Sequence, residues 1–513
     1  MKVKKILIAF ICPLLLFSIY SYRVFLNAWA CDDIMITMRA VLNFVNGYGP
    51  VSNVGERVQP FTHPLWFFLL SFTYFLTKNW YLTPFYLSII ISLLTFILFI
   101  IYNRNNLFSL IIGSVTLICS KSYINFSTSG LEAPLSHLLL LLLVIIGENI
   151  KNSLYKSDKR KLGLFFLIFS LIFLTRQDLI LLTFPYILYI SKTSNIKIKT
   201  IILTFLTYSV PASLWELFSL YYYGFPFPNT YYAKQYTGIP LEIYIRQGLN
   251  YITSFLLFDP FAMFMLNLSL FLFFYKKNFL AINIGIILYV CYIIYVGGDF
   301  MAGRFFTPVL FFSVLKFRYL IFKNYIEPSI FTTLIIISGI LSITMEKRGF
   351  YTLPGHYWYK GIADEQGEYY QNRNLKAAIR ETKNSATLNW DFKKATNIEM
   401  ERGSGAITAL TLGPNIYILD VYALNQPLLA RIPASDNIRF RPGHVERRIP
   451  TGYIESIREE KNIIQNKEIH DFYNHLYRVT SGKLNSLERF KSILYLNFIK
   501  KSVSKDVLTQ EDY

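Results

Sequence analysis

Charged residues are scarce in this sequence. Asp, Glu, Lys and Arg make up only 16% of its 513 residues, whereas 53% are hydrophobic and the mean hydropathy is +0.36. Soluble globular proteins typically carry about 25% charged residues. A soluble chain of this length would need more charge on its surface, so the composition argues for a membrane protein.

Cysteine and histidine are also rare, with four and six residues. No cysteine lies in the polar portion after residue 345, so a disulfide framework is excluded there. The histidines are scattered, and no Cys–His cluster has the spacing of metal ligands. A Gly-rich loop of the nucleotide-binding type is missing as well, which disfavours a nucleotide-using enzyme. We expect no cofactor, although the sequence leaves a divalent metal open.

Long apolar runs dominate the first two thirds of the chain. A spanning helix needs about 20 apolar residues, or somewhat fewer inside a bundle. We predict eleven spans, near residues 6–26, 81–102, 107–120, 132–148, 162–174, 179–191, 200–222, 252–275, 279–296, 305–322 and 328–345. The shorter run 64–77 fits a helix that lies along the membrane interface.

Basic residues are concentrated in the short loops between these runs. Lys and Arg outnumber Asp and Glu by 26 to 12 up to residue 345, but only by 25 to 20 in residues 346–513. Cytoplasmic loops typically carry such an excess. We therefore place the N-terminus in the cytoplasm, together with the basic loops at 148–161, 192–199, 276–278 and 316–323. The net charge of +19 then reflects membrane orientation and does not indicate a nucleic-acid partner.

The composition changes after residue 345, because residues 346–513 are polar and contain no spanning run. The stretch 407–424 predicts two strands about a turn, and the stretches near 369–383 and 453–500 predict amphipathic helices. The sequence thus predicts a polytopic α-helical membrane domain over residues 1–345. An extracytoplasmic mixed α/β domain follows over residues 346–513.

Nearly all the ionisable residues close to the predicted spans fall on the outer side. They are Asp32, Asp33, Arg39, His63, Glu132, Arg176, Asp178, Lys234, Asp299 and Arg304. Charged groups near a bilayer interior are costly, so their gathering on one face of the membrane indicates a functional site there.

The adjacent acids Asp32 and Asp33 open a predicted helix just after the first span. The structural interpretation is helix capping, for which Asp is well suited. The functional interpretation makes one carboxylate a general base that takes a proton from an attacking hydroxyl. Arg39 lies seven residues after Asp32 on the same helical face and could orient that carboxylate. The spacing alone does not decide between the two interpretations.

Two further groups of charged residues lie at the ends of predicted spans. Arg304 could hold a phosphate, because guanidinium pairs with phosphate oxygens in two-pronged fashion, or it could pair with Asp299 as a clamp. Glu132, Arg176 and Asp178 could contact a ligand, or form a structural ion pair between helices.

The aromatic segment 221–235 carries Asn229, Tyr231 and Lys234 as candidate contacts for a sugar or a phosphate. The alternative is an aromatic belt at the membrane interface. His63 is a further candidate, although a lone histidine more often packs or hydrogen-bonds locally.

Taken together, these motifs resemble the polyprenyl-phosphate-dependent membrane glycosyltransferases of the GT-C superfamily. Within it, the chain is most similar to the family of the mycobacterial terminal β-(1→2)-arabinofuranosyltransferase. The matching segments are ACDDIMITMR (30–39), NGYGPVSNVGERVQPFTHPLW (46–66), SGLEAPL (129–135), LTRQD (174–178), YYGFPFPNTYYAK (222–234), GGDFMAGRFFTPVL (297–310), LDVYALNQPLLARIP (419–433) and RPGHVERRIPTGYIES (441–456). The chain departs from the family pattern at two positions, with Gln177 where proline is expected and His63 where serine is usual.

The resemblance implies a GT-C fold and an inverting transfer of a sugar from a polyprenyl phosphate to a cell-envelope glycan or lipopolysaccharide. Arabinofuranose follows as the donor sugar from the resemblance only. The acid of the first outer loop, which serves as catalytic base in this family, falls on Asp32 or Asp33. The phosphate would be held by basic residues such as Arg304, Arg176 and Lys234. The resemblance also places the protein in a bacterial inner membrane, with the site on the periplasmic side.

Two other classes of function fit the same composition. A transporter or flippase for a lipid-linked sugar often shows two matching halves, and none are evident in this sequence. A glycan-binding membrane protein without catalytic activity would tolerate replacement of the paired aspartates.

Overall fold

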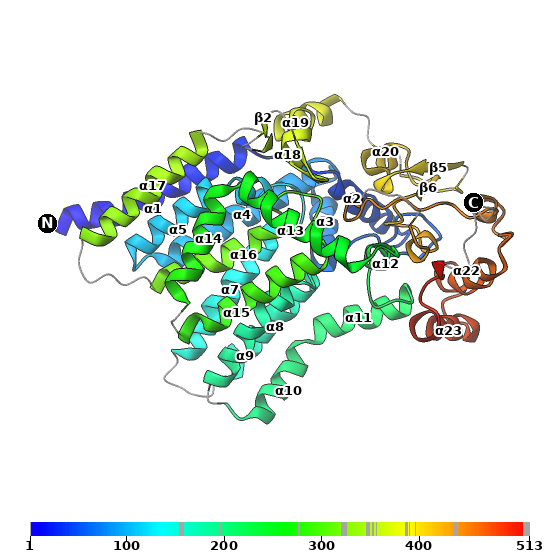
Figure 1. Ribbon diagram of the computed structural model, residues 1–513, viewed down its shortest axis with the longest axis horizontal. Coiled ribbons are helices and arrows are strands. Elements are labelled where there is room, and N and C mark those ends of the chain that lie inside the picture. Colours follow the sequence, from blue (N-terminus) through cyan, green and yellow to red (C-terminus); the bar gives the residue numbers. More distant parts are fainter. Residues whose placement is uncertain are drawn as a thin grey trace. The chain divides into compact units, whose positions relative to one another are not determined.

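The computed structural model describes residues 2–152, 159–194, 196–274, 277–319, 326–344, 349–350, 353–354, 357–384, 388, 390–395, 397–434 and 440–505 (Figure 1). This part of the chain is mostly helical. It divides into two compact units that interleave along the sequence. The first comprises Met1–Cys31, Tyr81–Ala212 and Ile245–Lys383, and the second comprises Asp32–Trp80, Ser213–Tyr244 and Asn384–Tyr513.

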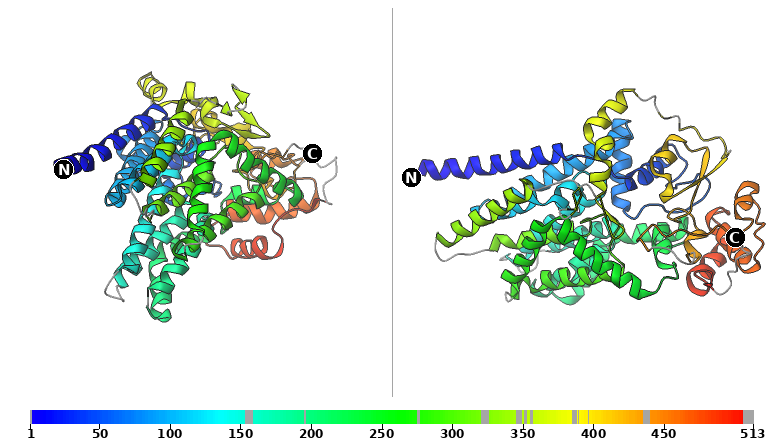
Figure 2. Two further views of the ribbon diagram at one scale, coloured as in Figure 1. Left: turned by 60° about the vertical axis from the view of Figure 1, so that its left-hand side comes forward. Right: turned by 45° about the horizontal axis from the view of Figure 1, so that its top comes forward.

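The first unit is a bundle of apolar helices, which the two views of Figure 2 show side by side. Its helices are α1 (Lys2–Leu26), α4 (Leu82–Asn103), α5 (Leu107–Cys119), α6 (Lys121–Phe126), α7 (Ala133–Lys151), α8 (Lys159–Thr175), α9 (Leu179–Thr193), α10 (Ile198–Tyr208), most of α13 (Leu241–Phe258), α14 (Pro260–Phe273), α15 (Lys277–Tyr295), α16 (Phe306–Val314), η1 (Leu315–Tyr319) and α17 (Ile326–Thr344). Helix α9 packs on α15, α7 packs on α4 and α8, and α5 packs on α1 and α17.

The length and composition of these helices support a membrane protein without fixing the number of spans. Within the described residues, two helices, α4 and α7, are long and apolar enough to cross a membrane, and up to four spans result if each of two bent helix pairs counts as one. Each predicted run is helical over its described residues, including the interfacial run, which is α3 (Pro64–Thr77). The predicted span 200–222 is bent by 50° between α10 and α11 (Val210–Tyr222). Eleven spans, and the GT-C type of fold, remain predictions.

The predicted span 252–275 is not continuous. Helices α13 and α14 meet at 108° instead. The break follows from Asp259 and Pro260: the Asp259 carboxylate caps α14 by accepting the backbone N–H of Ala262, and proline suits the first turn of a helix. The other Asp259 oxygen accepts hydrogen bonds from the Ser120 and Ser122 hydroxyls at 2.7 and 2.6 Å, which compensates this buried carboxylate.

The predicted domain boundary at residue 345 does not coincide with the division between the units. Residues 349–383 cluster with the helical bundle and contribute the hairpins β1 (Gly349–Phe350) with β2 (Leu353–Pro354) and β3 (Trp358–Tyr359) with β4 (Ile362–Ala363), then α18 (Glu365–Arg373) and α19 (Leu375–Asn384). Backbone hydrogen bonds tie this segment down: Ala363 bonds to Phe300 and Ala302. A buried ion pair at 3.2 Å between Lys121 and Asp364 adds a further attachment.

The second unit combines helices with a small parallel sheet. Its elements are α2 (Asp33–Val45), α3 (Pro64–Thr77), most of α11 (Val210–Tyr222), α12 (Asn229–Gln235), β5 (Asn397–Glu401), η2 (Gly403–Gly405), α20 (Ala406–Thr411), β6 (Ile416–Asp420), η3 (Leu429–Arg431), α21 (Tyr453–Glu459), α22 (Lys467–Thr480), α23 (Leu487–Leu494) and the π-helical turn η4 (Tyr495–Ile499). The prediction of helices within 453–500 is confirmed.

The two strands predicted within 407–424 are partly wrong. Only β6 is a strand, and it pairs in parallel with β5, from Asn397 opposite Ile416 to Glu401 opposite Asp420. A parallel pair requires a crossover, and α20 supplies it. Gly405, with φ of 69°, turns the chain into α20, a left-handed conformation that glycine adopts without strain.

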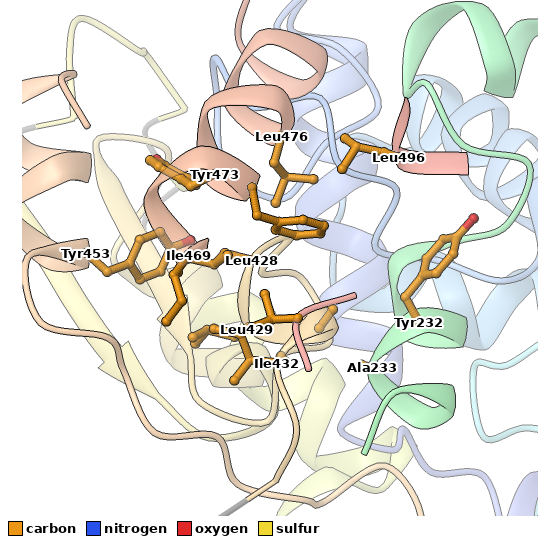
Figure 3. Close-up of a cluster of buried hydrophobic side chains, with 14 of the residues drawn as sticks. Tyr232, Ala233, Leu428, Leu429, Ile432, Tyr453, Ile469, Tyr473, Leu476 and Leu496 are labelled. Atoms are coloured by element: carbon orange, nitrogen blue, oxygen red, sulfur yellow. The ribbon is translucent and has the colours of Figure 1, made fainter. Parts of the chain in front are cut away.

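A cluster of buried hydrophobic side chains lies in the second unit (Figure 3). It joins Tyr232 and Ala233 of α12 to the segment Leu428–Ile432 and to α22. Leu496 of η4 closes one side beside Leu476. Segments distant in sequence therefore share one core, which is why the second unit is not a contiguous C-terminal domain.

Several predicted basic loops lie partly outside the described residues, at 153–158, 195, 275–276 and 320–325. Their assignment to the cytoplasm stays a prediction.

A partly buried acid, Glu56, lies against polar groups of the second unit that carry no positive charge. The Tyr417 hydroxyl donates to its carboxylate at 2.9 Å, and Tyr417 and Tyr453 share the Gln426 side-chain oxygen at 3.1 Å each. Burial raises the pKa of Glu56 to about 7, and the hydrogen bonds from Tyr417 and Asn53 offset this only in part.

This raised pKa predicts that the second unit loses stability as the pH rises. Between the ordinary pKa of Glu, 4.5, and about 7, the folded protein holds one proton more than the unfolded chain, so the free energy of unfolding falls with pH. Glu56→Gln should be more stable than the wild type at pH 8, by roughly 1–3 kcal/mol, and nearly equal to it at pH 4.5. Thermal unfolding of the detergent-solubilised full chain measures this. The exposed Glu459→Gln is the control, and equal effects of the two variants would contradict the assignment.

Candidate functional site

Acidic and basic side chains meet in the first unit at the turn between α8 and α9. Arg176 follows α8 directly, and Asp178 occupies the N-cap position of α9. Glu132 occupies the N-cap position of α7. Helix termini leave backbone N–H groups unpaired, and an acid at a helix N-terminus is favoured by the helix dipole. Local sequence thus places all three charges at helix ends.

The Arg176 guanidinium organises this acid–arginine cluster. It donates to the two Asp178 oxygens at 3.1 and 2.5 Å and to the Tyr289 hydroxyl of α15 at 2.9 Å. The Tyr289 hydroxyl in turn donates to Asp178 at 2.6 Å. Glu132 lies 3.7 Å from the same guanidinium. Helices α7, α8, α9 and α15 are therefore tied together at one point.

The electrostatics of the cluster keep both partners charged. Burial by itself raises the pKa of Asp178, but Arg176, Tyr289 and the nearby Arg304 outweigh it and hold that pKa below its usual value. Burial lowers the pKa of Arg176, but the charges of Asp178 and Glu132 outweigh it and raise that pKa well above its usual range. The cluster is thus a permanent ion network at neutral pH.

A second pair, Asp299 and Arg304, lies in the loop between α15 and α16. Their side chains approach to 2.5 Å, so the clamp considered from the sequence does form. The loop is held by the buried Tyr251, whose hydroxyl donates to the Met301 carbonyl and accepts the Phe305 N–H. Gly298, with φ of 73°, leaves room for that ring, since a Cβ there would meet Tyr251 atoms at 2.5 Å.

Phe305 connects the two ion pairs. The Arg176 guanidinium lies 4.8 Å from the centre of the Phe305 ring, and the Arg304 guanidinium lies 5.5 Å from it. Each guanidinium is attracted to the face of the aromatic ring. The two positive charges also repel each other, and nearby acids must offset that repulsion. Glu132, Asp178 and Asp299 supply those acids. The structure thus brings together five of the twelve residues that the sequence marks as candidates.

The other seven candidates lie in the second unit. Asp32 is the N-cap residue of α2, but its backbone is already helical, with φ of −66° and ψ of −43°, and its side chain makes no capping hydrogen bond to this fully described helix. Asp33 is the first residue of α2, and both acids are half-buried. The backbone of the preceding residue, Cys31 of the first unit, donates to the Ser129 carbonyl at 3.0 Å.

Arg39 is buried and bonds to the backbone of its own unit. Its guanidinium donates to the carbonyls of Ser52, Ala409, Gly413 and Ile416, the first, third and fourth at 2.8, 3.0 and 2.9 Å. Burial lowers the pKa of Arg39 to about 10, so it stays charged at neutral pH. These bonds attach α2 to α20 and β6.

The remaining candidates are dispersed over the second unit. His63 is buried and shares a hydrogen bond of 3.1 Å with Thr37. The Asn229 side chain donates to three carbonyls of residues 423–426 and accepts from Arg431. Tyr231 is exposed and packs on Phe227, and Lys234 is exposed near Gly443. Asn229 therefore has a structural task that the sequence did not reveal.

Some residues of the acid–arginine cluster carried no signal in the sequence. Tyr289 stands in an apolar run, where a tyrosine looks like any packing residue. Phe305 follows Arg304 directly, so the cation–aromatic contact could have been suspected from their adjacency. The buried Asp259 lay inside a predicted span, and an acid at such a place is itself a warning of a break.

An apolar cavity of about 660 Å³ is also present in the first unit, between α1, α5 and α17. Only aliphatic and thiol side chains line it, among them Leu16, Ile111, Cys119 and Ile340. Such a lining suits a hydrocarbon chain. Among the described residues, no group of three or more His, Cys, Asp or Glu side chains could hold a metal ion.

Comparison with known proteins gives one distant relative. The chain is 24% identical to the terminal β-(1→2)-arabinofuranosyltransferase of Mycobacterium tuberculosis over 245 residues, which cover 44% of this chain and 38% of the relative. No model of a known protein family and no solved structure matches. The match supports a distant relationship to a glycosyltransferase, over well under half of that enzyme's length.

The bonds of Arg39 predict a structural role that can be measured. Arg39→Gln should lower the stability by about 3 kcal/mol, because several buried carbonyls lose their donor. Thermal unfolding of the full chain measures the loss. The exposed Arg402→Gln, which breaks an ion pair with Glu446, should change the stability by about 0.5 kcal/mol or less. Unchanged stability in Arg39→Gln would contradict this role.

The acid–arginine cluster predicts strong coupling between Arg176 and Asp178. Arg176→Met alone should cost about 3–5 kcal/mol, because it leaves buried acids without their cation. Asp178→Asn added to it should recover part of that loss, with a coupling energy of roughly 1–3 kcal/mol. A double-mutant cycle on thermal unfolding measures the coupling, and additive effects would show that the pair does not interact.

Proposed function

We propose that this protein is a membrane glycosyltransferase that moves a sugar, arabinofuranose in the first instance, from a polyprenyl phosphate to a glycan of the cell envelope. The observation that carries the proposal is the distant relationship to an arabinofuranosyltransferase. The apolar helices and the charged groups at their ends support the same proposal. The site would lie on the outer face of a bacterial inner membrane.

Transfer from such a donor is a single displacement at the anomeric carbon. The acceptor hydroxyl oxygen attacks the anomeric carbon while the bond from that carbon to the phosphate oxygen breaks. The electron pair leaves with the polyprenyl phosphate, and the configuration at the anomeric carbon inverts. The hydroxyl proton passes to a carboxylate, a step that typically contributes about 10²- to 10⁴-fold in rate. No nucleotide and no nucleotide-binding loop is required.

Asp32 or Asp33 is our choice for that carboxylate. Both are half-buried at the start of a helix, so each carboxylate is partly shielded from water. Either acid could act as the base, with the other as its partner.

Arg304 and Arg176 are our choice for the groups that face the leaving phosphate. Guanidinium binds phosphate oxygens in a two-pronged geometry, and developing charge on the leaving group favours such neighbours. Both are now matched by acids, so phosphate would have to displace or share the Asp299 and Asp178 contacts. Lys234 is a further candidate for this role. The apolar cavity between α1, α5 and α17 suits the isoprenoid chain.

Replacing the paired aspartates tests the proposal. Transfer from a radiolabelled polyprenyl-phosphate sugar to candidate envelope glycans is measured with purified full-length protein in lipid. Asp32→Asn and Asp33→Asn are expected to lower the transfer rate, at least one of them by roughly 10²-fold or more. The exposed acid Asp471 lies in the same unit, and Asp471→Asn is the matched control.

Three outcomes are informative. Loss in one aspartate variant with a normal unfolding temperature supports the base. Wild-type transfer in both variants removes that role. Binding of the lipid-linked sugar without any transfer by the wild type favours a transporter or a glycan-binding protein instead.

A further inference from the structure

Helix α23 and the turn η4 that follows it expose a row of large apolar side chains. Leu487, Phe490, Phe498 and Ile499 are 69%, 58%, 77% and 76% exposed, and Leu494 is exposed too. Leu487, Phe490, Leu494 and Phe498 are spaced by three to four residues, which places them on one face of a helix, and Ile499 adjoins Phe498. In water such a continuous apolar face is costly, so it indicates a surface that is normally covered. We call these five residues the α23 face.

The opposite side of the same helix is packed into the second unit. Arg489, Ser492 and Leu496 are buried, and Leu496 closes the core cluster (Figure 3). The buried Arg489 donates to the Val479 carbonyl at 3.0 Å and the Tyr222 carbonyl at 2.9 Å. The helix is therefore fixed in orientation, and the α23 face cannot turn inward.

Its place in the second unit indicates what covers the α23 face. Three hydrogen bonds of 2.9 Å attach α23 and its flanks to the C-terminal end of α11, at Tyr221, Tyr222 and Gly224. Helix α11 exposes Leu214, Leu217 and Tyr221, as a helix in contact with lipid does. It ends the predicted span 200–222. The α23 face is thus attached to the outer end of a predicted membrane helix.

The charges around the α23 face match a bilayer surface. Lys483, Lys491 and Lys501 are exposed on or beside this segment, and Glu488 is the one exposed acid within α23. Amphipathic helices with large apolar side chains and lysines lie in the plane of the membrane interface, with the apolar face among the acyl chains and the cations at lipid phosphates. A second protein copy would not explain the lysines.

From these contacts we infer that α23 and η4 form an in-plane membrane anchor of the second unit, which binds the surface of a bilayer containing anionic phospholipid. The apolar side chains enter the interface, and the three lysines contact lipid phosphates. The anchor would hold the second unit at the membrane surface. This inference does not depend on the proposed enzymatic activity.

Spin labels on the full chain test the anchor in lipid nanodiscs. Phe490→Cys and Phe498→Cys are labelled in a variant whose four native cysteines are replaced by alanine. Met400→Cys on β5 is the matched control, because Met400 is equally apolar and 58% exposed. Collision rates with oxygen, which enters lipid, and with a water-soluble nickel chelate are compared. The oxygen-to-nickel ratio is expected to be several-fold higher at 490 and 498 than at 400.

The remaining outcomes overturn the anchor or part of it. Ratios equal to that at 400 would place the α23 face in water. Labels protected from both reagents only at high protein concentration would show that a second copy covers it. Reversing the charges, with Lys483→Glu, Lys491→Glu and Lys501→Glu together, should lower the ratio in anionic nanodiscs and leave it unchanged in zwitterionic ones. No difference between the two lipids would exclude a preference for anionic phospholipid.

Discussion

A charged group among apolar helices must be matched by an opposite charge or by several hydrogen bonds, because water is not available to solvate it. This constraint recurs throughout the first unit. Arg176 is matched by Asp178, Glu132 and Tyr289, Arg304 by Asp299, and Lys121 by Asp364. Asp259, which accepts from two serine hydroxyls and two backbone N–H groups, meets the same requirement through hydrogen bonds. The Asp299–Arg304 pair closes a single loop, whereas the other solutions join segments that are distant in sequence.

The matched charges also bear on function. An arginine that is paired with an acid has a fixed side-chain geometry. It can bind an incoming phosphate only if the acid moves away or if the guanidinium contacts both groups. Arg176 and Arg304 meet at one ring, Phe305, and are held there by three acids. The same contacts that stabilise the bundle therefore set the electrostatics of the candidate site. Stability and activity are expected to respond together when these residues are changed.

The second unit meets the constraint differently. The Arg39 guanidinium donates hydrogen bonds to four backbone carbonyls, and these bonds connect α2 to α20 and β6. Asn229 plays a comparable part between α12 and residues 423–426. Both were marked as candidate ligand contacts by their sequence, because a polar residue in an apolar or aromatic segment looks the same whether it binds substrate or backbone. Only the partner distinguishes the two.

The sequence predicts the apolar runs, their helical state and the helical stretches within 453–500. These features depend on the spacing of apolar residues and on capping residues, which are both local properties of the chain. The same is true of the charges at span ends. The sequence could not predict the break at Asp259–Pro260 as part of the fold, the helix α20 in place of a strand, or the inclusion of residues 349–383 in the helical bundle. The break arises locally, from the Asp259 cap and Pro260, and the bond from Ser120 supports it. The inclusion of residues 349–383 depends on contacts between residues more than a hundred positions apart, such as Lys121 with Asp364. The sequence by itself determined which residues are charged and where helices begin. The tertiary structure decided which charges meet, because the nearest partner of a buried ion is set by packing and not by position along the chain.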